Sequence, residues 1–297
     1  MDWDRHRNSN TIYRLEHHTD MVFRITFLGT GGGRHTTMYQ IRSTGGMLIE
    51  HNEKFLHIDP GPGALTNMHR IRYDLTRTDS LIISHCHPDH YSDAECVLEG
   101  MSRGGWVKNG HLYGSKSVIS GNGNLGPCVS DYHKSIVDSV TEFAPGDVLD
   151  VDGLKVDICR ADHSDPCNVG FRFHTDDGIV SYVSDTAYSN EIADQYKGSR
   201  VLLLPVTTPS GNRIKYHLCT DDAITFVDRV KPELAVFIHL GVVIIRRGPE
   251  NEAKMVEDAT GIRTIAARDL MTLDVGDDLE IGDAETFNDL WIPDSSP

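Results

Sequence analysis

The chain is divided into short apolar segments separated by polar ones, and most of these segments have the length and pattern of β-strands. Residues 23–28 alternate apolar and polar side chains, which predicts a strand with one buried face. Residues 81–83, 201–206 and 234–238 are almost entirely apolar, which is typical of strands buried on both faces. We predict further strands over residues 37–43, 46–51, 55–58, 154–159, 169–174 and 179–184, with other short strands inside 136–160.

Helical patterns separate the later strands. We predict helices over residues 93–101, 187–197, 221–230 and 250–260. The order is strands first, then a helix and strands, and then the same again, without an internal repeat of fixed period. This order indicates an α/β protein with two packed sheets and helices outside them.

Two segments do not fit this alternation. Residues 1–20 are polar and rich in His, Arg and Asp, and we expect them to form an extension before a single domain at 21–297. Residues 102–135 are rich in glycine and serine. They are equally compatible with a loop that carries specificity and with a disordered connector.

Composition limits the class of protein. The 297 residues are 39% hydrophobic, which is enough for a sizeable core. The net charge of −16 argues against a large nucleic-acid interface. None of the six cysteines forms a Cys-x-x-Cys pair and no signal peptide is visible, so we expect reduced thiols and a cytoplasmic protein. No apolar run has the length that spans a bilayer.

Four potential metal ligands follow directly after the apolar residues 81–83. They are His85, His87, Asp89 and His90, with Pro88 stiffening the loop between them. A single histidine is usually a surface residue or a core residue with satisfied hydrogen bonds, but four such side chains within six positions are hard to explain in that way. Imidazole and carboxylate suit divalent transition metals, so the cluster predicts a metal site. Cys86 alternates away from these side chains, and we interpret it as a packing residue.

The pattern His-x-His-x-Asp-His at 85–90 resembles the signature of the metallo-β-lactamase superfamily. Other segments resemble the remaining motifs of that family in the same order. Residues 55–61 resemble the first motif, and His163, Asp185 and His239 lie in segments that resemble the third, fourth and fifth. The resemblance extends over about residues 21–275 and implies a four-layer αβ/βα sandwich, with the metal site at the edge between two mixed sheets.

The resemblance also implies a ligand set for two divalent ions. One ion would be held by His85, His87 and His163, the second by Asp89, His90 and His239, with Asp185 bridging them. Such a pair lowers the pKa of a bridging water and stabilises developing negative charge, and Asp89 could also orient that water. Zinc suits these ligands best, and manganese or iron would also be accepted. Asp59 would orient the histidine loop without binding metal.

Two further segments resemble the ribonuclease Z and phosphodiesterase branch of the superfamily. Residues 27–31 resemble its Phe-Leu-Gly-Thr-Gly start, and residues 217–223 resemble its His-x-x-x-x-[Asp/Glu]-Ala segment. This implies that His217 is a general acid or transition-state donor. The alternative is a histidine at a helix start that is capped by Thr220.

Three cations could contact a substrate anion. Arg34 follows the glycine run at 29–33, and Arg213 and Lys215 precede His217. A glycine run lets backbone N–H groups approach an anion, although it could equally be a loop that packs tightly against other loops. All three cations could also be ordinary exposed charges.

The sequence therefore predicts a dinuclear metal-dependent hydrolase, with a small-molecule or short nucleotide phosphodiester as the substrate. The alternatives are an RNA 3′-processing endonuclease of the ribonuclease Z type, a lactonase or thioesterase, and a metal-bearing scaffold that binds a ligand without turnover. Residues 91–96 lack the Gly-Leu-Pro-Gly-Leu-Leu-like segment of ribonuclease Z, and no basic glycine-rich arm is visible. We expect no membrane partner, and the sequence leaves a homo-oligomer open.

Overall fold

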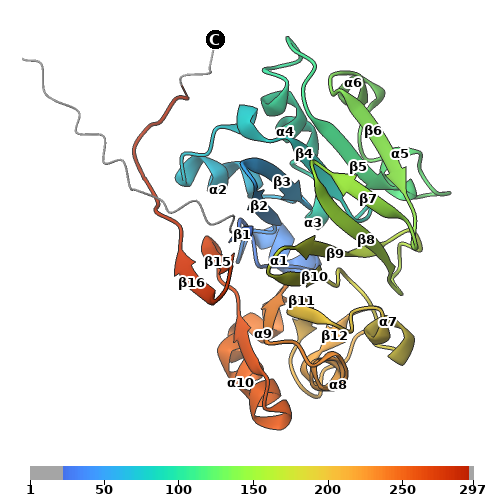
Figure 1. The fold of residues 1–297 in the computed structure, drawn as a ribbon, viewed down its shortest axis with the longest axis vertical. Helices are drawn as coiled ribbons and strands as arrows, with labels where there is room; N and C mark the ends of the chain where they lie inside the picture. The colour runs from blue at the N-terminus through green and yellow to red at the C-terminus, as the bar shows by residue number, and fades with distance from the viewer. Residues whose placement is uncertain (1–22, 294–297) are drawn as a thin grey trace, which may run out of the picture.

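Two mixed β-sheets form the centre of the computed structural model, which describes residues 23–293 (Figure 1). The strands of the first sheet are, in spatial order, β16 (Leu279–Asp283), β15 (Met271–Val275), β1 (Phe23–Phe27), β2 (Met47–His51), β3 (Lys54–Ile58), β4 (Ser80–Ile83), β5 (His111–Ser115) and β6 (Ser139–Phe143). The strands of the second are β14 (Arg263–Ala266), β13 (Leu234–Ile238), β11 (Ser199–Thr208), β10 (Gly178–Tyr182), β9 (Val169–Thr175), β8 (Leu154–Arg160) and β7 (Val148–Val151), with β12 (Leu218–Cys219) beside β11.

Most of the helices lie on the outer faces of the two sheets. The helices are α1 (Arg34–Tyr39), α2 (Ala64–Arg70), α3 (Pro88–Tyr91), α4 (Ala94–Met101), α5 (Lys116–Ile119), α6 (Asp131–Ser135), α7 (Asn190–Asp194), α8 (Thr220–Val230), α9 (Val242–Arg247) and α10 (Pro249–Thr260), with a 3-10 turn at Leu75–Arg77. Of these, α1 and α3 lie in loops at the strand ends. Apolar residues of α4 and α5 pack with β4 and β5 of the first sheet. Those of α7, α8 and α10 pack with β11 and β13 of the second (Figure 1).

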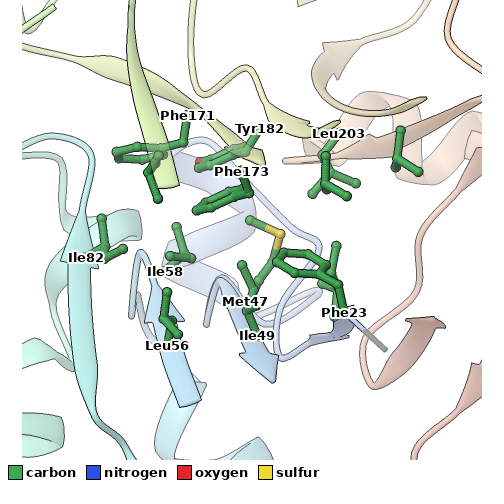
Figure 2. Packing of buried hydrophobic residues seen from close by; sticks show 14 of the residues in the cluster. Phe23, Met47, Ile49, Leu56, Ile58, Ile82, Phe171, Phe173, Tyr182 and Leu203 are labelled. Atoms are coloured by element: carbon green, nitrogen blue, oxygen red, sulfur yellow. The ribbon is translucent and has the colours of Figure 1, made fainter. Parts of the chain in front are cut away.

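The main core lies between the two sheets. In Figure 2, Phe23, Met47 and Ile58 from the first sheet face Phe171 and Phe173 from the second. Each such side chain contributes about 1.5–3 kcal/mol when it is fully buried. With helices outside both sheets, the chain has the four layers predicted from its sequence.

Most of the predicted elements are present, but residues 37–43 do not form a strand. They contain the end of α1 and a loop. Helix α1 buries only Thr36, whose hydroxyl donates to the carbonyl oxygen of Leu240, and leaves Met38 and Tyr39 exposed. The apolar residues at 38 and 41 that suggested a strand are therefore surface residues.

Residues 102–135 are more regular than predicted. They contain β5, which pairs in parallel with both β4 and β6 and is buried at Leu112 and Tyr113. The strand contains Gly114, where a Cβ atom would lie 2.9 Å from side-chain atoms of Val118 and Ile119. The alternative prediction, that residues 102–135 are a disordered connector, is therefore wrong, because this segment supplies an interior strand. Helix α7 is shorter than the predicted 187–197, and the predicted polar extension at 1–20 lies outside the described residues.

Candidate metal centre

The candidate ligands lie at one edge of the molecule because the strands that precede them run in the same direction. Strands β3 and β4 are parallel, and the loops after them carry Asp59 and the 85–90 cluster. In the second sheet β10, β11 and β13 are parallel, and β8 has the same direction because both β8 and β10 are antiparallel to β9. The loops after β8, β10 and β13 carry His163, Asp185 and His239.

Three imidazole nitrogens converge in the first group. The Nδ1 atom of His87 lies 2.9 Å from Nε2 of His85 and 3.0 Å from Nε2 of His163. Ligands placed tetrahedrally around one zinc ion at about 2.0–2.1 Å are roughly 3.3 Å apart. The spacing therefore suits a single small ion, as the resemblance implied for these residues.

A second group forms beside the first. Nε2 of His239 lies 3.3 Å from Oδ2 of Asp89, and Nε2 of His90 lies 4.0 Å from the same oxygen. Oδ2 of Asp185 lies 3.2 Å from His239 Nε2 and 3.8 Å from His163 Nε2. Asp185 thus contacts both groups, as a bridging ligand must.

Each of four histidines has its Nδ1 atom held by a partner outside the ligand set. His85 Nδ1–H points to the hydroxyl of Ser84 at 3.0 Å, His90 Nδ1–H to Asp59 at 3.0 Å, His163 Nδ1–H to the carbonyl of Tyr216 at 3.1 Å, and His239 Nδ1–H to the hydroxyl of Thr207 at 3.0 Å. Such bonds fix the tautomer and leave Nε2 free for a metal. His87 instead turns Nδ1 inward, and its Nε2 lies 3.4 Å from the hydroxyl of Ser164.

Asp59 occupies the position predicted for it, beneath the histidine loop. Its carboxylate accepts hydrogen bonds from the backbone N–H and hydroxyl of Ser84, both at 2.7 Å, and from the hydroxyl of Tyr182 at 2.8 Å. Together with the bond from His90, these contacts tie the loop to both sheets. Asp59 thus holds the ligands without facing the ion sites itself.

Several buried atoms of the centre lack a hydrogen-bond partner. They are His90 Nε2, His239 Nε2 and Asp185 Oδ1. Leaving such atoms unpaired costs about 1–3 kcal/mol each, and a metal ion would satisfy all three at once. The donor set of the chain therefore fits divalent ions.

The electrostatics of the centre also suit metal binding. Burial, together with the charges of His90 and His163, lowers the pKa of His85 well below its ordinary value. Burial, opposed by Asp185, lowers the pKa of His163 to about 4, so both rings are neutral at pH 7. Burial opposes charge on His90, but the surrounding carboxylates outweigh it and raise its pKa well above the usual range. In the metal-free protein His90 therefore holds a proton that a metal ion would displace.

His217 lies at the rim of this centre. Its Nε2 atom is 3.5 Å from Asp185 Oδ2, and its ring stacks on that of His239 with centroids 5.9 Å apart. Burial opposes its charge, but the hydrogen bond and charge of Asp185 raise the pKa of His217. The cap of α8 is Cys219, in a capping box with Asp222, so the interpretation with Thr220 as the cap is wrong.

The three predicted substrate cations differ in their surroundings. Arg34 is exposed and follows Gly33, whose N–H donates to Asp89 at 2.9 Å, so it lies beside the second ion site. Lys215 is exposed and stacks over the ring of Tyr216. Arg213 forms a bidentate ion pair with Asp222, which leaves it less free for a substrate than predicted.

Sequence reasoning missed Ser84, Thr207 and the carbonyl of Tyr216. Ser84 directly precedes His85 and Thr207 follows the apolar residues 201–206, so both lie at strand ends. Their position at a strand end was a weak indication that they could support a ligand. Nothing in the sequence indicated the role of Tyr216, because every residue has a backbone carbonyl. Within the described residues, no helix is long and apolar enough to cross a membrane.

Comparisons with known proteins agree with this geometry. Residues 55–240 match the family described as "Beta-lactamase superfamily domain". An uncharacterised protein of Methanocaldococcus jannaschii is 39% identical over 250 residues, which cover 84% of this chain and 93% of that protein. A ribonuclease Z of Methanosarcina acetivorans is 27% identical over 145 residues, which cover 49% of this chain and 46% of that enzyme.

Solved structures share the fold. The metallo-beta-lactamase fold protein YhfI from Bacillus subtilis has a TM-score of 0.72 at 17% identity, covering 85% of this chain and 99% of that one. A diphosphatase from the PhnP family has a TM-score of 0.62 at 16% identity, with 86% and 97% covered. The short form of human tRNase Z has a TM-score of 0.62 at 14% identity, with 85% and 99% covered. These matches confirm the predicted fold.

Proposed function

Because the chain belongs to the beta-lactamase superfamily, we propose that it is a dinuclear metal-dependent phosphodiesterase acting on a small or short nucleotide substrate. The relatives support a hydrolase related to ribonuclease Z. What carries the finer proposal is the position of His217 over a complete ligand set, 3.5 Å from the bridging Asp185. The free cysteines among the described residues fit a reducing, cytoplasmic environment.

The two ions would be held by His85, His87 and His163 and by Asp89, His90 and His239, with Asp185 shared. When bound there, divalent ions lower the pKa of a water and polarise a phosphoryl oxygen. Zinc suits the nitrogen-rich donor set, and manganese or iron would also fit.

The chain's own residues have distinct tasks in this proposal. The Asp89 side chain is only 14% exposed and accepts a hydrogen bond from the Gly33 N–H, so its carboxylate has a fixed direction in which to orient the attacking water. His217, whose raised pKa keeps a proton available near neutral pH, donates Nε2–H to the leaving oxygen. In the same proposal, Arg34 and Lys215 contact non-reacting oxygens of the substrate.

The experiment is hydrolysis of bis(p-nitrophenyl) phosphate by zinc- and manganese-loaded protein, beside the variant His217→Ala. We expect metal-dependent turnover that falls by about 10²–10⁴-fold in the variant, with both ions retained. The control is His133→Ala, a histidine of α6 that pairs with Glu95 and Glu99. It should leave turnover unchanged.

Absence of turnover with both ions bound would contradict the phosphodiesterase proposal and direct the search to lactones and thioesters. If these were also inert, the scaffold hypothesis would be favoured. The ribonuclease Z relatives also favour a second candidate, an RNA 3′-processing endonuclease. Cleavage of precursor tRNA more efficient than that of small diesters would support this second function, although the net charge of −16 argues against it.

A further inference from the structure

Asp165 lies outside the ligand set but beside the first ion site. It follows His163 by two residues and its side chain is fully buried. Its carboxylate accepts three hydrogen bonds. The donors are the backbone N–H of Cys86 at 2.9 Å, the backbone N–H of Cys167 at 2.9 Å and the hydroxyl of Ser117 at 2.5 Å.

The bond from Cys86 connects two ligand loops that belong to different sheets. Cys86 stands between His85 and His87 in the loop after β4, whereas Asp165 belongs to the loop after β8 that carries His163. One carboxylate thus fixes the distance between the loops that supply all three imidazoles of the first site.

Helix α5 supplies a further donor to this carboxylate. Ser117 donates to the same oxygen, Oδ2, that accepts from Cys86, and its own hydroxyl lies 3.1 Å from that of Ser115. Both serines are fully buried. Asp165 therefore cannot rotate away from this position without breaking several buried hydrogen bonds.

The charge of Asp165 is the second consideration. None of its hydrogen-bond donors within residues 23–293 is a cation. The first ion site has three neutral imidazoles, and its one carboxylate, Asp185, would be shared with the second site. A nearby carboxylate that no cation neutralises raises the affinity of such a site for a divalent ion.

We propose that Asp165 is a positioning residue for the ion held by His85, His87 and His163. It sets the separation of the two ligand loops and supplies negative charge behind them. This inference rests on the proposed metal centre. It adds a residue that binds neither metal nor substrate and whose effect is confined to one of the two ions.

The test uses Asp165→Asn in the full chain, with Zn²⁺ binding measured by competition with a chromogenic chelator. Wild-type protein should bind two ions. The variant should bind one ion about 10–100-fold more weakly and keep the other unchanged, as is usual when the partner of a ligand loop is removed. To identify the weakened ion, the substitution is combined with His87→Ala. In that background, which already lacks the first ion, Asp165→Asn should have no further effect.

The matched control is Asp269→Asn. Asp269 also accepts three hydrogen bonds, from the N–H and hydroxyl of Thr30 and the N–H of Ser43, but it supports the glycine loop. It should leave the ion at His85, His87 and His163 at wild-type affinity. Comparing the thermal midpoints of both metal-free variants separates a general loss of stability from a specific loss of one ion.

Wild-type affinity for both ions in Asp165→Asn, or equal weakening of both, would overturn the proposal. If that variant does not fold, Ser117→Ala replaces it, because it removes one bond but keeps the carboxylate. Weakening of the same ion by severalfold would support the proposal, and unchanged binding would overturn it. If wild-type protein binds no ion, the metal centre itself is refuted. This outcome differs from one in which both ions bind and Asp165→Asn changes neither affinity.

Discussion

Histidines of the same chemistry have different roles here because their partners differ. His57 is fully buried, and its Nε2–H donates to the carbonyl of Gly45 at 2.9 Å while Nδ1 has no partner. Burial, opposed by that bond and by the charge of Asp59, lowers the pKa of His57 to about 4. His90, equally buried, faces carboxylates and has its pKa raised. Burial alone therefore does not decide the charge of a histidine.

His57 should make the stability of the metal-free protein depend on pH. Its folded pKa of about 4 lies below the unfolded value of 6.5, so the unfolded chain binds more protons between these values. Its contribution is complete above pH 6.5 and is lost as pH falls toward 4. Between pH 7 and pH 5 the unfolding free energy should decrease by about 2 kcal/mol more in wild type than in His57→Gln. Urea unfolding in EDTA measures this difference, and parallel pH profiles would contradict it.

The ligand residues were predictable, but of the residues that support them only Asp59 was. His85, His87, Asp89 and His90 stand together in the sequence, so their chemistry is visible without a fold. Thr207 and Asp165 become recognisable only when distant loops meet, since threonine and aspartate are common in any loop. Arg213 was predicted as a substrate contact for its charge, and the sequence contained no sign that Asp222 would pair with it.

At the scale of elements, the glycine loop between β1 and α1 has a steric function. A Cβ atom on Gly32 would lie 2.2 Å from the ring of His239. The N–H of the same residue donates to the carbonyl of Leu240 at 3.1 Å, so the loop lies flat against the strand end that carries this ligand. This favours tight packing near other loops over anion binding as the reason for the glycine at this position.

Gly32→Ala should therefore displace His239 and remove the ion that it helps to hold. We expect the variant to bind one zinc ion instead of two and to lose hydrolytic activity, as measured by metal analysis and turnover. Gly33→Ala is the comparison, because its Cβ would meet only a methyl group of Thr207 at 3.7 Å. It places an alanine at φ 76°, ψ 158°, a region that glycine alone adopts readily, at a cost of about 1–3 kcal/mol, but should keep both ions. Two ions in Gly32→Ala would show that the ring can move without harm.

Elements were predictable where burial sets the pattern. Strand β13 was predicted at its observed bounds, because all five of its side chains are buried and apolar. Helix α1 was missed, since only Thr36 of its six residues is buried and no apolar periodicity marks it. Strand β5 was missed because Gly114 and its flanking serine resemble a loop composition.

At the scale of the molecule, the candidate ligands come from loops of both sheets. His85, His87, Asp89 and His90 follow β4 of the first sheet, and His163, Asp185 and His239 follow strands of the second, so a bound ion would contact both. The two-sheet order was predictable from the alternation of elements. Which edge of the sheets would carry the site depended on strand directions that only the pairing reveals.

Metal should accordingly stabilise the entire domain. Each ion present at about 100 times its dissociation constant adds about 2.7 kcal/mol, which raises the thermal midpoint of a chain of this size by about 4 °C. Thermal unfolding with zinc and with EDTA measures this shift. Replacing Asp185 by Ala should abolish most of this shift in the thermal midpoint. A midpoint that does not change with EDTA would contradict the proposal that bound ions hold the two sheets together.

The carbonyl of Tyr216, which orients His163, has a consequence for how this protein could diversify. Because a main-chain oxygen performs that task, exposed side chains in the loop at 210–216, such as Ile214 and Lys215, can change in character while His163 keeps its hydrogen-bond acceptor. Several positions of this loop are exposed, and they directly precede His217 in the chain. Inserting or deleting a residue there would instead move both the carbonyl and the adjacent His217. Relatives could therefore acquire new substrates by substitution in this loop, whereas changes in its length would reduce catalytic activity.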